Sequence, residues 1–260
     1  TPGTVVAICT CHVDDNAVAG QQWWLDIKYK AFERQFGGAS RDVLPFRHCG
    51  INHTMTNRGL KQDQDEYCQK LVPYKISRDR ANKETAELTP DELSGLRAVL
   101  GGLLWLCQTR LDIICDVVLC QQEVARATIA TLKAANSCLT RAKKYAEGCG
   151  LYYPKLPLPL KLCTIGDSSH ATRTSSFAQE GCIILLMHDK TLRVVTSDSP
   201  HYKKILNSRS DMSDFGIVLA YVSHKAKRVS SSTSTAETLI ANFGKELAQL
   251  VGLRLTEIFG

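Results

Sequence analysis

The segment LKLCTI at Leu160–Ile165, followed by Gly166 and Asp167, opens the part of the chain that decides the fold class. A short apolar run that ends in turn-forming residues predicts a β-strand. More strand-like segments follow it, and the apolar spacing near the C-terminus predicts a helix. The expected strands are Phe177–Met187, Thr191–Thr196 and Gly216–Val222, the expected helix is Thr235–Ile258, and Ser197–Ser213 is expected to be a polar loop. Residues 159–260 are therefore predicted to form a mixed sheet with helices.

Upstream of this region, residues 78–158 have the pattern of a helical unit. Thr89 and Glu92 form a capping box around Pro90, which is a strong signal for the start of a helix. Gly148, Gly150 and the prolines at positions 154, 157 and 159 predict where the unit ends. The expected helices are Pro90–Cys107, Asp112–Arg126 and Ile129–Glu147, preceded by a polar linker at Arg78–Glu87.

Residues 1–77 show two strand pairs and two helices. Val5–Val13 and Ala17–Ala19 flank three polar residues, 14–16, which predicts a hairpin with its turn at those residues. The other expected elements are strands at Val43–Met55 and Leu60–Gln64 and helices at Trp23–Phe36 and Asp65–Leu71. Together the three regions predict an α/β (α+β) fold.

The composition of the 260-residue chain is that of a globular protein. It is 44% hydrophobic and 22% charged, which excludes wholesale disorder. No apolar run reaches the roughly 18 residues that span a bilayer, and no secretory signal is present, so we expect no membrane partner and an intracellular location. Eleven cysteines without such a signal favour reduced thiols. The net charge of +6 permits a polyanionic partner. Because no initiator Met is present, we expect a piece of a longer product.

Asp14 and Asp15, at the tip of the first hairpin, are the first candidate site. Adjacent carboxylates between apolar strands are costly unless they are solvated or bind cations, and Mg²⁺ is held by carboxylates together with substrate phosphates. The alternative is an ordinary polar turn.

Asp167 and Glu237 are the second and third candidates. Asp167 ends an expected strand, where a carboxylate suits a metal ligand, although an Asx turn would explain it equally. Glu237 projects from the first turn of the last helix, where Ser234 and Glu237 alternatively form a capping box. A third interpretation makes Ser168 a hydrolase nucleophile, with Asp198 and His201 as its partners.

Zinc is a further possibility for a set of soft ligands near the N-terminus. On a strand, Cys9 and Cys11 share one face while His12 points to the other. No Cys-x-x-Cys spacing occurs, so buried thiols and ordinary strand histidines are the expected explanation. The full set is Cys9, Cys11, His12, His48, Cys49 and His53.

Taken in order, these segments resemble the Ty1/copia-type reverse transcriptases of long-terminal-repeat retrotransposons. The run from His12 to Gly20 resembles the Tyr-Val-Asp-Asp polymerase box, with His12 in place of the tyrosine. The segment from Ser223 to Glu237 resembles the Ser/Lys-rich signature that precedes the catalytic Glu of the attached ribonuclease H domain. The remaining similar segments are Phe46–Ile51, Gln64–Tyr67, Leu100–Trp105, Thr109–Ile113 (with Leu111 in place of a proline) and Gly166–Ala171.

The resemblance implies three parts: the end of a polymerase palm at 1–77, a helical thumb or connection at 78–158, and a truncated ribonuclease H-like domain at 159–260. It implies that Asp14, Asp15, Asp167 and Glu237 bind Mg²⁺ or Mn²⁺, and that further carboxylates lie outside this chain. Cys49 and Gly50 would lie near the primer end.

It also implies that a group of basic residues contacts phosphates, although a solvated charged strand end would look the same. These residues are Lys225, Lys227 and Arg228. The implied partners are a primer-template, an RNA–DNA hybrid and the rest of a Pol polyprotein. The implied location is the cytoplasm, within a virus-like particle, or the nucleus. A non-catalytic remnant that binds nucleic acid or is only structural is the alternative.

Overall fold

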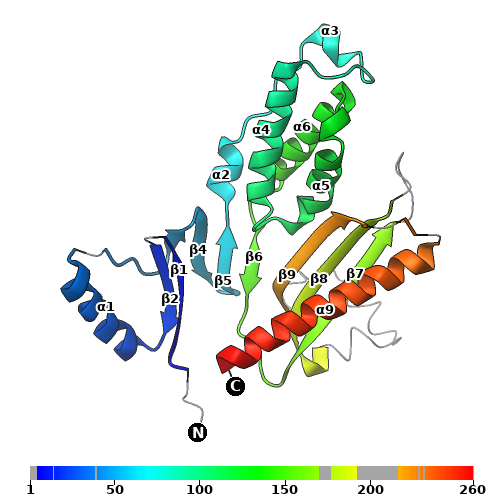
Figure 1. Ribbon diagram of the computed structural model, residues 1–260. Coiled ribbons are helices and arrows are strands. Elements are labelled where there is room, and N and C mark those ends of the chain that lie inside the picture. Colours follow the sequence, from blue (N-terminus) through cyan, green and yellow to red (C-terminus); the bar gives the residue numbers. More distant parts are fainter. Residues whose placement is uncertain are drawn as a thin grey trace.

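The computed structural model describes residues 5–13, 15–38, 40–169, 177–191, 216–227, 229–230 and 232–259 (Figure 1). Helices and antiparallel sheets are mixed along the chain, which confirms the α/β class. Within the described residues, the strands form a two-stranded, a four-stranded and a three-stranded sheet. A bundle of helices stands above the two larger sheets in Figure 1.

The N-terminal hairpin consists of β1 (Ala7–His12) and β2 (Asp15–Gly20), followed by α1 (Gln22–Phe36). The predicted hairpin and helix are confirmed, but the predicted turn at residues 14–16 is wrong. His12 pairs with Asp15, so Asp15 already belongs to β2 and the loop is only two residues long. Val13 adopts a positive φ of 54°, as two-residue hairpin loops require. Asp14 lies outside the described residues.

The four-stranded sheet contains β3 (Phe46–His48), β4 (Ile51–Thr56), β5 (Gly59–Asp63) and β6 (Leu151–Tyr153). The single strand predicted over Val43–Met55 is in fact two strands. Cys49 and Gly50 have φ values of 48° and 76°, and this tight turn reverses the chain so that β3 pairs with β4. β6 arrives from far along the sequence, after the helical region, and pairs with β5.

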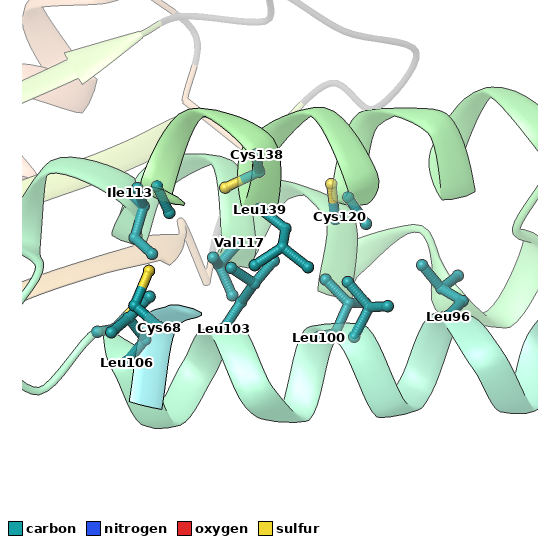
Figure 2. Close-up of a cluster of buried hydrophobic side chains, with 14 of the residues drawn as sticks. Cys68, Leu96, Leu100, Leu103, Leu106, Ile113, Val117, Cys120, Cys138 and Leu139 are labelled. Atoms are coloured by element: carbon teal, nitrogen blue, oxygen red, sulfur yellow. The ribbon is translucent and has the colours of Figure 1, made fainter. Parts of the chain in front are cut away.

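The helical bundle follows β5. It contains α2 (Asp65–Lys70), α3 (Arg78–Ala81), α4 (Pro90–Leu106), α5 (Ile114–Gln122) and α6 (Ile129–Lys144). The three longer predicted helices are confirmed, although short 3₁₀ turns at Leu111–Ile113 and Val124–Arg126 take up the ends of the predicted second helix. Figure 2 shows the core between these helices, which includes fully buried side chains such as Leu96, Leu103 and Leu139.

The predicted linker at Arg78–Glu87 is docked against the bundle. The Arg80 guanidinium binds the Glu92 carboxylate at 2.6 Å and also donates to the carbonyl of Glu87. Glu92 completes the predicted capping box, because its side chain accepts from the backbone N–H of Thr89 at 2.9 Å. One carboxylate therefore both caps α4 and fixes the segment that precedes it.

This arrangement predicts a specific acid sensitivity. The Arg80 guanidinium, with the backbone N–H of Thr89, lowers the pKa of Glu92 from 4.5 to about 2. Because the pKa of Glu92 is lower in the folded than in the unfolded chain, the charged carboxylate stabilises the fold at pH values above 4.5. This stabilisation is lost as the pH falls from 4.5 towards 2. Glu92→Gln should therefore lower the melting temperature by roughly 2–4 °C at pH 7, and the difference should vanish near pH 2. Thermal melts across this pH range measure it, with the exposed Glu147→Gln as control; an equal deficit at every pH would contradict it.

The C-terminal unit contains β7 (Leu160–Ser169), β8 (Gln179–His188) and β9 (Gly216–Lys225), followed by α9 (Thr233–Phe259). β8 lies between its two neighbours, and both pairings are antiparallel. The strands predicted at Leu160–Ile165, Phe177–Met187 and Gly216–Val222 and the predicted helix are confirmed. The strand predicted at Thr191–Thr196 is not, because Thr191 belongs to a short helical turn at residues 189–191. Residues 192–196 and the Ser197–Ser213 loop lie outside the described residues. α9 lies across β7 and β8 (Figure 1).

α9 lies close against the sheet because small residues line its inner face. A Cβ on Gly244 would come within 2.5 Å of Thr164 Cγ2 and 3.0 Å of Cys182 Sγ. Ala236 and Ile240 are buried on the same side of the helix. The position of α9 is thus set by direct contact with β7 and β8.

The bundle and the C-terminal unit also touch each other. The hydroxyl of Tyr221 in β9 donates to the carbonyl of Cys107 at the end of α4. The amide of Gln122 in α5 donates to the Gln179 side chain in β8 at 2.8 Å. The three-stranded sheet is therefore joined to the bundle through hydrogen bonds from two of its strands.

Candidate two-carboxylate site

Asp167 lies two residues before the end of β7. It is not a strand-ending Asx turn, because β7 continues through Ser169 and Asp167 pairs with Gly181. Thr164 and Gly166 contact α9, and alternate residues of a strand point to opposite faces. The exposed Asp167 side chain therefore points away from the face that α9 covers.

Glu237 lies in the second turn of α9, so it is not the capping residue that was considered as its alternative role. The helix begins at Thr233, where the backbone N–H of Thr235 donates to Ser232 Oγ at 3.2 Å. Ser234 is inside the helix, where its carbonyl accepts from the Thr238 hydroxyl. The capping box predicted for Ser234 and Glu237 is thus wrong, because the helix starts earlier than its sequence pattern suggests. The Glu237 side chain is exposed.

The two carboxylates belong to the same end of the C-terminal unit. Ile240, which follows Glu237 by three residues, lies 3.4 Å from the position of a Cβ on Gly166, the neighbour of Asp167. β7 is at the edge of the described sheet. Carboxylate oxygens are the donors that Mg²⁺ and Mn²⁺ prefer, so the chemistry of both residues fits the expected ions. Within the described part of the chain, no three His, Cys, Asp or Glu side chains gather closely enough to bind a metal ion.

A shallow groove of about 550 Å³ runs between β7 and α9. Its lining combines uncharged side chains with one cation, and the residues are Thr164, Gly166, Ala241, Lys245, Ala248 and Gln249. Glu237, Ala241 and Lys245 are spaced four residues apart, so they follow one side of the helix. Glu237 therefore lies one helical turn before the first helix residue that lines the groove, and Lys245 lines the groove itself.

The expected phosphate-binding residues lie at the end of β9. Lys225 is exposed, and its ammonium group lies 4.0 Å from the centre of the Phe177 ring. Lys227 is also exposed, whereas Arg228 lies outside the described residues. Both lysines precede α9 closely and are accessible to a polyanion.

Glu180 and His224 lie at ion-pair distance from each other, a contact that the sequence analysis did not predict. His224 Nε2 lies 2.9 Å from Glu180 Oε2, and Glu180 is only 5% exposed. Both residues join a row across the sheet, because Ser168 pairs with Glu180 and Glu180 pairs with His224. The sequence feature that could have indicated this pair is Glu180 itself, at the start of an otherwise apolar strand. A glutamate that is buried there requires a polar partner.

The same row argues against the hydrolase interpretation. Ser168 is 9% exposed and its hydroxyl oxygen is buried, so a substrate cannot reach it in this arrangement. The other expected members, Asp198 and His201, lie outside the described residues.

The expected polymerase residues lie on two separate elements. Asp15 is exposed at the tip of the β1–β2 hairpin, opposite His12. The Cys49–Gly50 turn lies against α4, because a Cβ on Gly50 would come within 3.5 Å of the Trp105 ring. The Trp105 ring therefore packs against the turn, a contact that the sequence did not predict.

The expected zinc ligands are not brought together as one set. Burial was expected for the thiols, but Cys9 and Cys11 are exposed on the hairpin. His48 and His53 lie in the four-stranded sheet, with ring centres 6.4 Å apart, and Cys49 Sγ lies 3.4 Å from His48 Nε2. The thiols of Cys9 and Cys11, however, lie in contact with each other.

No family model, curated protein or solved structure matches this chain. In the part of the chain that the structure describes, none of the helices has the length and apolar character of a membrane span. Function is therefore inferred from the chain's own motifs and from the geometry described above.

Proposed function

We propose that this chain is part of a Ty1/copia-type RNA-directed DNA polymerase with an attached ribonuclease H-like domain, and that its substrates are RNA–DNA hybrids. The observation that supports this most is the arrangement of the C-terminal unit. Three antiparallel strands precede a long helix, with Asp167 late in the first strand and Glu237 early in the helix. Two carboxylates that are 70 residues apart in the sequence thus belong to one end of the unit.

In this proposal, Asp167 and Glu237 are two of the ligands for divalent cations. When bound, such ions activate water and stabilise the leaving oxygen in the cleavage of a phosphodiester. Lys225 and Lys227 would contact phosphates of the hybrid, and Lys245 would supply positive charge along the groove. Arg228 belongs to the same proposed set by sequence.

The N-terminal part carries the proposed polymerase residues. Asp14 and Asp15 would bind the metal ions of nucleotide addition, together with carboxylates from outside this chain. Cys49 and Gly50 would approach the primer end, and the support of their turn by Trp105 is compatible with that role. The remainder of the Pol polyprotein would be the partner of this region.

A non-catalytic, nucleic-acid-binding remnant is the second candidate. It is favoured by one observation, that Asp167 points away from the face of β7 that α9 covers, whereas Glu237 is carried by α9 itself. If the two side chains cannot share an ion, the exposed lysines would still bind a polyanion through charge alone.

Binding of Mn²⁺ separates the two candidates. Asp167→Asn and Glu237→Gln should each weaken Mn²⁺ binding at least tenfold, because a neutral amide replaces a carboxylate ligand. Both side chains are exposed, so neither change should alter the melting temperature by more than about 1 °C. Electron paramagnetic resonance titration of the full chain measures the binding, and Glu246→Gln, an exposed position on the same helix, is the matched control.

Affinity for an RNA–DNA hybrid provides the second measurement. If the ions bridge protein and phosphate, hybrid binding should be tighter in Mn²⁺ than in EDTA for the unmodified chain, but not for Asp167→Asn. Salt-sensitive binding that is indifferent to Mn²⁺ and to both substitutions would favour the non-catalytic remnant. Absence of hybrid binding even at low salt would contradict both candidates.

A further inference from the structure

Cys9 and Cys11 bring two thiols together on the exposed β1–β2 hairpin. Their Sγ atoms lie 3.9 Å apart, and both side chains are exposed. Two thiolates that bind one tetrahedral zinc ion, each at about 2.3 Å, are about 3.8 Å apart. The strand therefore already holds the two sulfur atoms at the separation of a chelating pair.

The strand does not favour a disulfide between these thiols. Residues i and i+2 of an extended strand have Cα atoms roughly 6.5–7 Å apart, which is at the upper limit for a disulfide. Both residues lie inside β1 and are paired with β2, Cys9 with Val18 and Cys11 with Asn16. Closing a disulfide would require the paired strand to bend, whereas binding a metal ion would not.

The hairpin supplies only half of a tetrahedral site. In the part of the chain that the structure describes, no third His, Cys, Asp or Glu joins this pair to make a metal-binding group. A structural zinc ion takes four protein ligands. A second molecule can supply the two remaining ligands.

The face around the thiols is suited to a second copy of the same hairpin. Residues that pair directly share a face, so the neighbours of the thiols are small and uncharged: Ala7, Asn16, Val18 and Gly20. The ionisable side chains that the structure describes at the tip, those of Asp15 and His12, belong to the opposite face by alternation. Two such faces can approach without repulsion between like charges, and a twofold axis between them brings four thiols together.

We propose that Cys9 and Cys11 form half of a thiolate site for zinc or a similar thiophilic divalent ion, completed by the same two cysteines of a second copy of this chain. Assembly joins two chains and one divalent ion and releases four thiol protons to solvent. Since the ion must displace these protons, its affinity should increase with pH. This site is independent of the proposed nucleic-acid function.

Titration of the full chain with Co²⁺ and Zn²⁺ under reducing conditions tests the site. Co²⁺ should give the intense visible absorption of a tetrahedral thiolate complex, saturating at one ion per two chains. Zn²⁺ should double the mass measured by light scattering, and EDTA should reverse the change. Cys9→Ser and Cys11→Ser should each abolish both signals.

Cys115→Ser is the matched control, because Cys115 is also exposed but lies on α5; it should retain the spectrum, the stoichiometry and the dimer. Circular dichroism establishes that each variant is folded. A monomeric mass at saturating Zn²⁺, one ion per single chain, or a dimer that persists in folded Cys11→Ser would each overturn the proposal.

Discussion

Leu103→Ala should lower the free energy of unfolding by about 3 kcal/mol, within the range of roughly 2–5 for a buried leucine. Leu103 is fully buried in α4, and it packs in the centre of the bundle core together with Val117 and Leu139 (Figure 2). Truncation removes apolar contacts and leaves a cavity that three rigid helices cannot fill. Denaturant unfolding followed by circular dichroism measures the loss.

The adjacent residue provides the control for this prediction. Leu104 has the same side chain in the same helix but is 46% exposed, so Leu104→Ala should cost less than about 1 kcal/mol. Since both changes have the same effect on helix propensity, the difference between them isolates burial. Equal losses for the two variants would mean that the bundle is not packed around Leu103 as described.

Gly244→Ala should destabilise the C-terminal unit by about 1–2 kcal/mol, although alanine is the better helix former by about 1. The added Cβ would lie 2.5 Å from Thr164 Cγ2 and 3.0 Å from Cys182 Sγ. Thr164 is β-branched and held in β7, so it cannot move aside without strain. The helix must instead shift away from the sheet, and thermal unfolding measures the cost.

Gly252→Ala, two turns further along α9, should have the opposite sign. A Cβ there would lie 3.5 Å from Leu162 Cδ1, which is an ordinary van der Waals contact. The gain in helix propensity then remains, and stability should increase by about 0.5–1 kcal/mol. If both substitutions stabilised the chain, α9 could not lie against β7 at the distance that we describe.

The secondary structure could largely be predicted, because local patterns determine it. The capping box at Thr89 and Glu92 places the start of α4 correctly, and the apolar spacing finds α1 and α9. The predictions failed where tertiary contacts or single residues of unusual backbone conformation decide. No sequence pattern indicates the positive φ of Cys49. None indicates the ion pair between Arg80 and Glu92, which lie 12 residues apart.

For the candidate site, the sequence predicts which residues take part and their order along the chain, but not their arrangement in space. Sequence motifs single out Asp167 and Glu237, but neither the face of β7 to which Asp167 points nor the true start of α9 follows from them. Glu180 and His224 were missed as a pair, because the contact depends on the register of β8 against β9. Register is fixed by the whole sheet and not by the residues next to the contact.

The pairing of β5 with β6 has a consequence for the order in which the chain folds. Pairing of Gln62 with Leu151 closes a loop of about 90 residues. Closing this loop costs chain entropy, and the short strand β6 gains only a few hydrogen bonds in return. The bundle occupies that loop, and once folded it holds the two ends close together, so most of the entropy has already been lost. We therefore expect β6 to join the sheet late, and to leave it whenever the bundle unfolds.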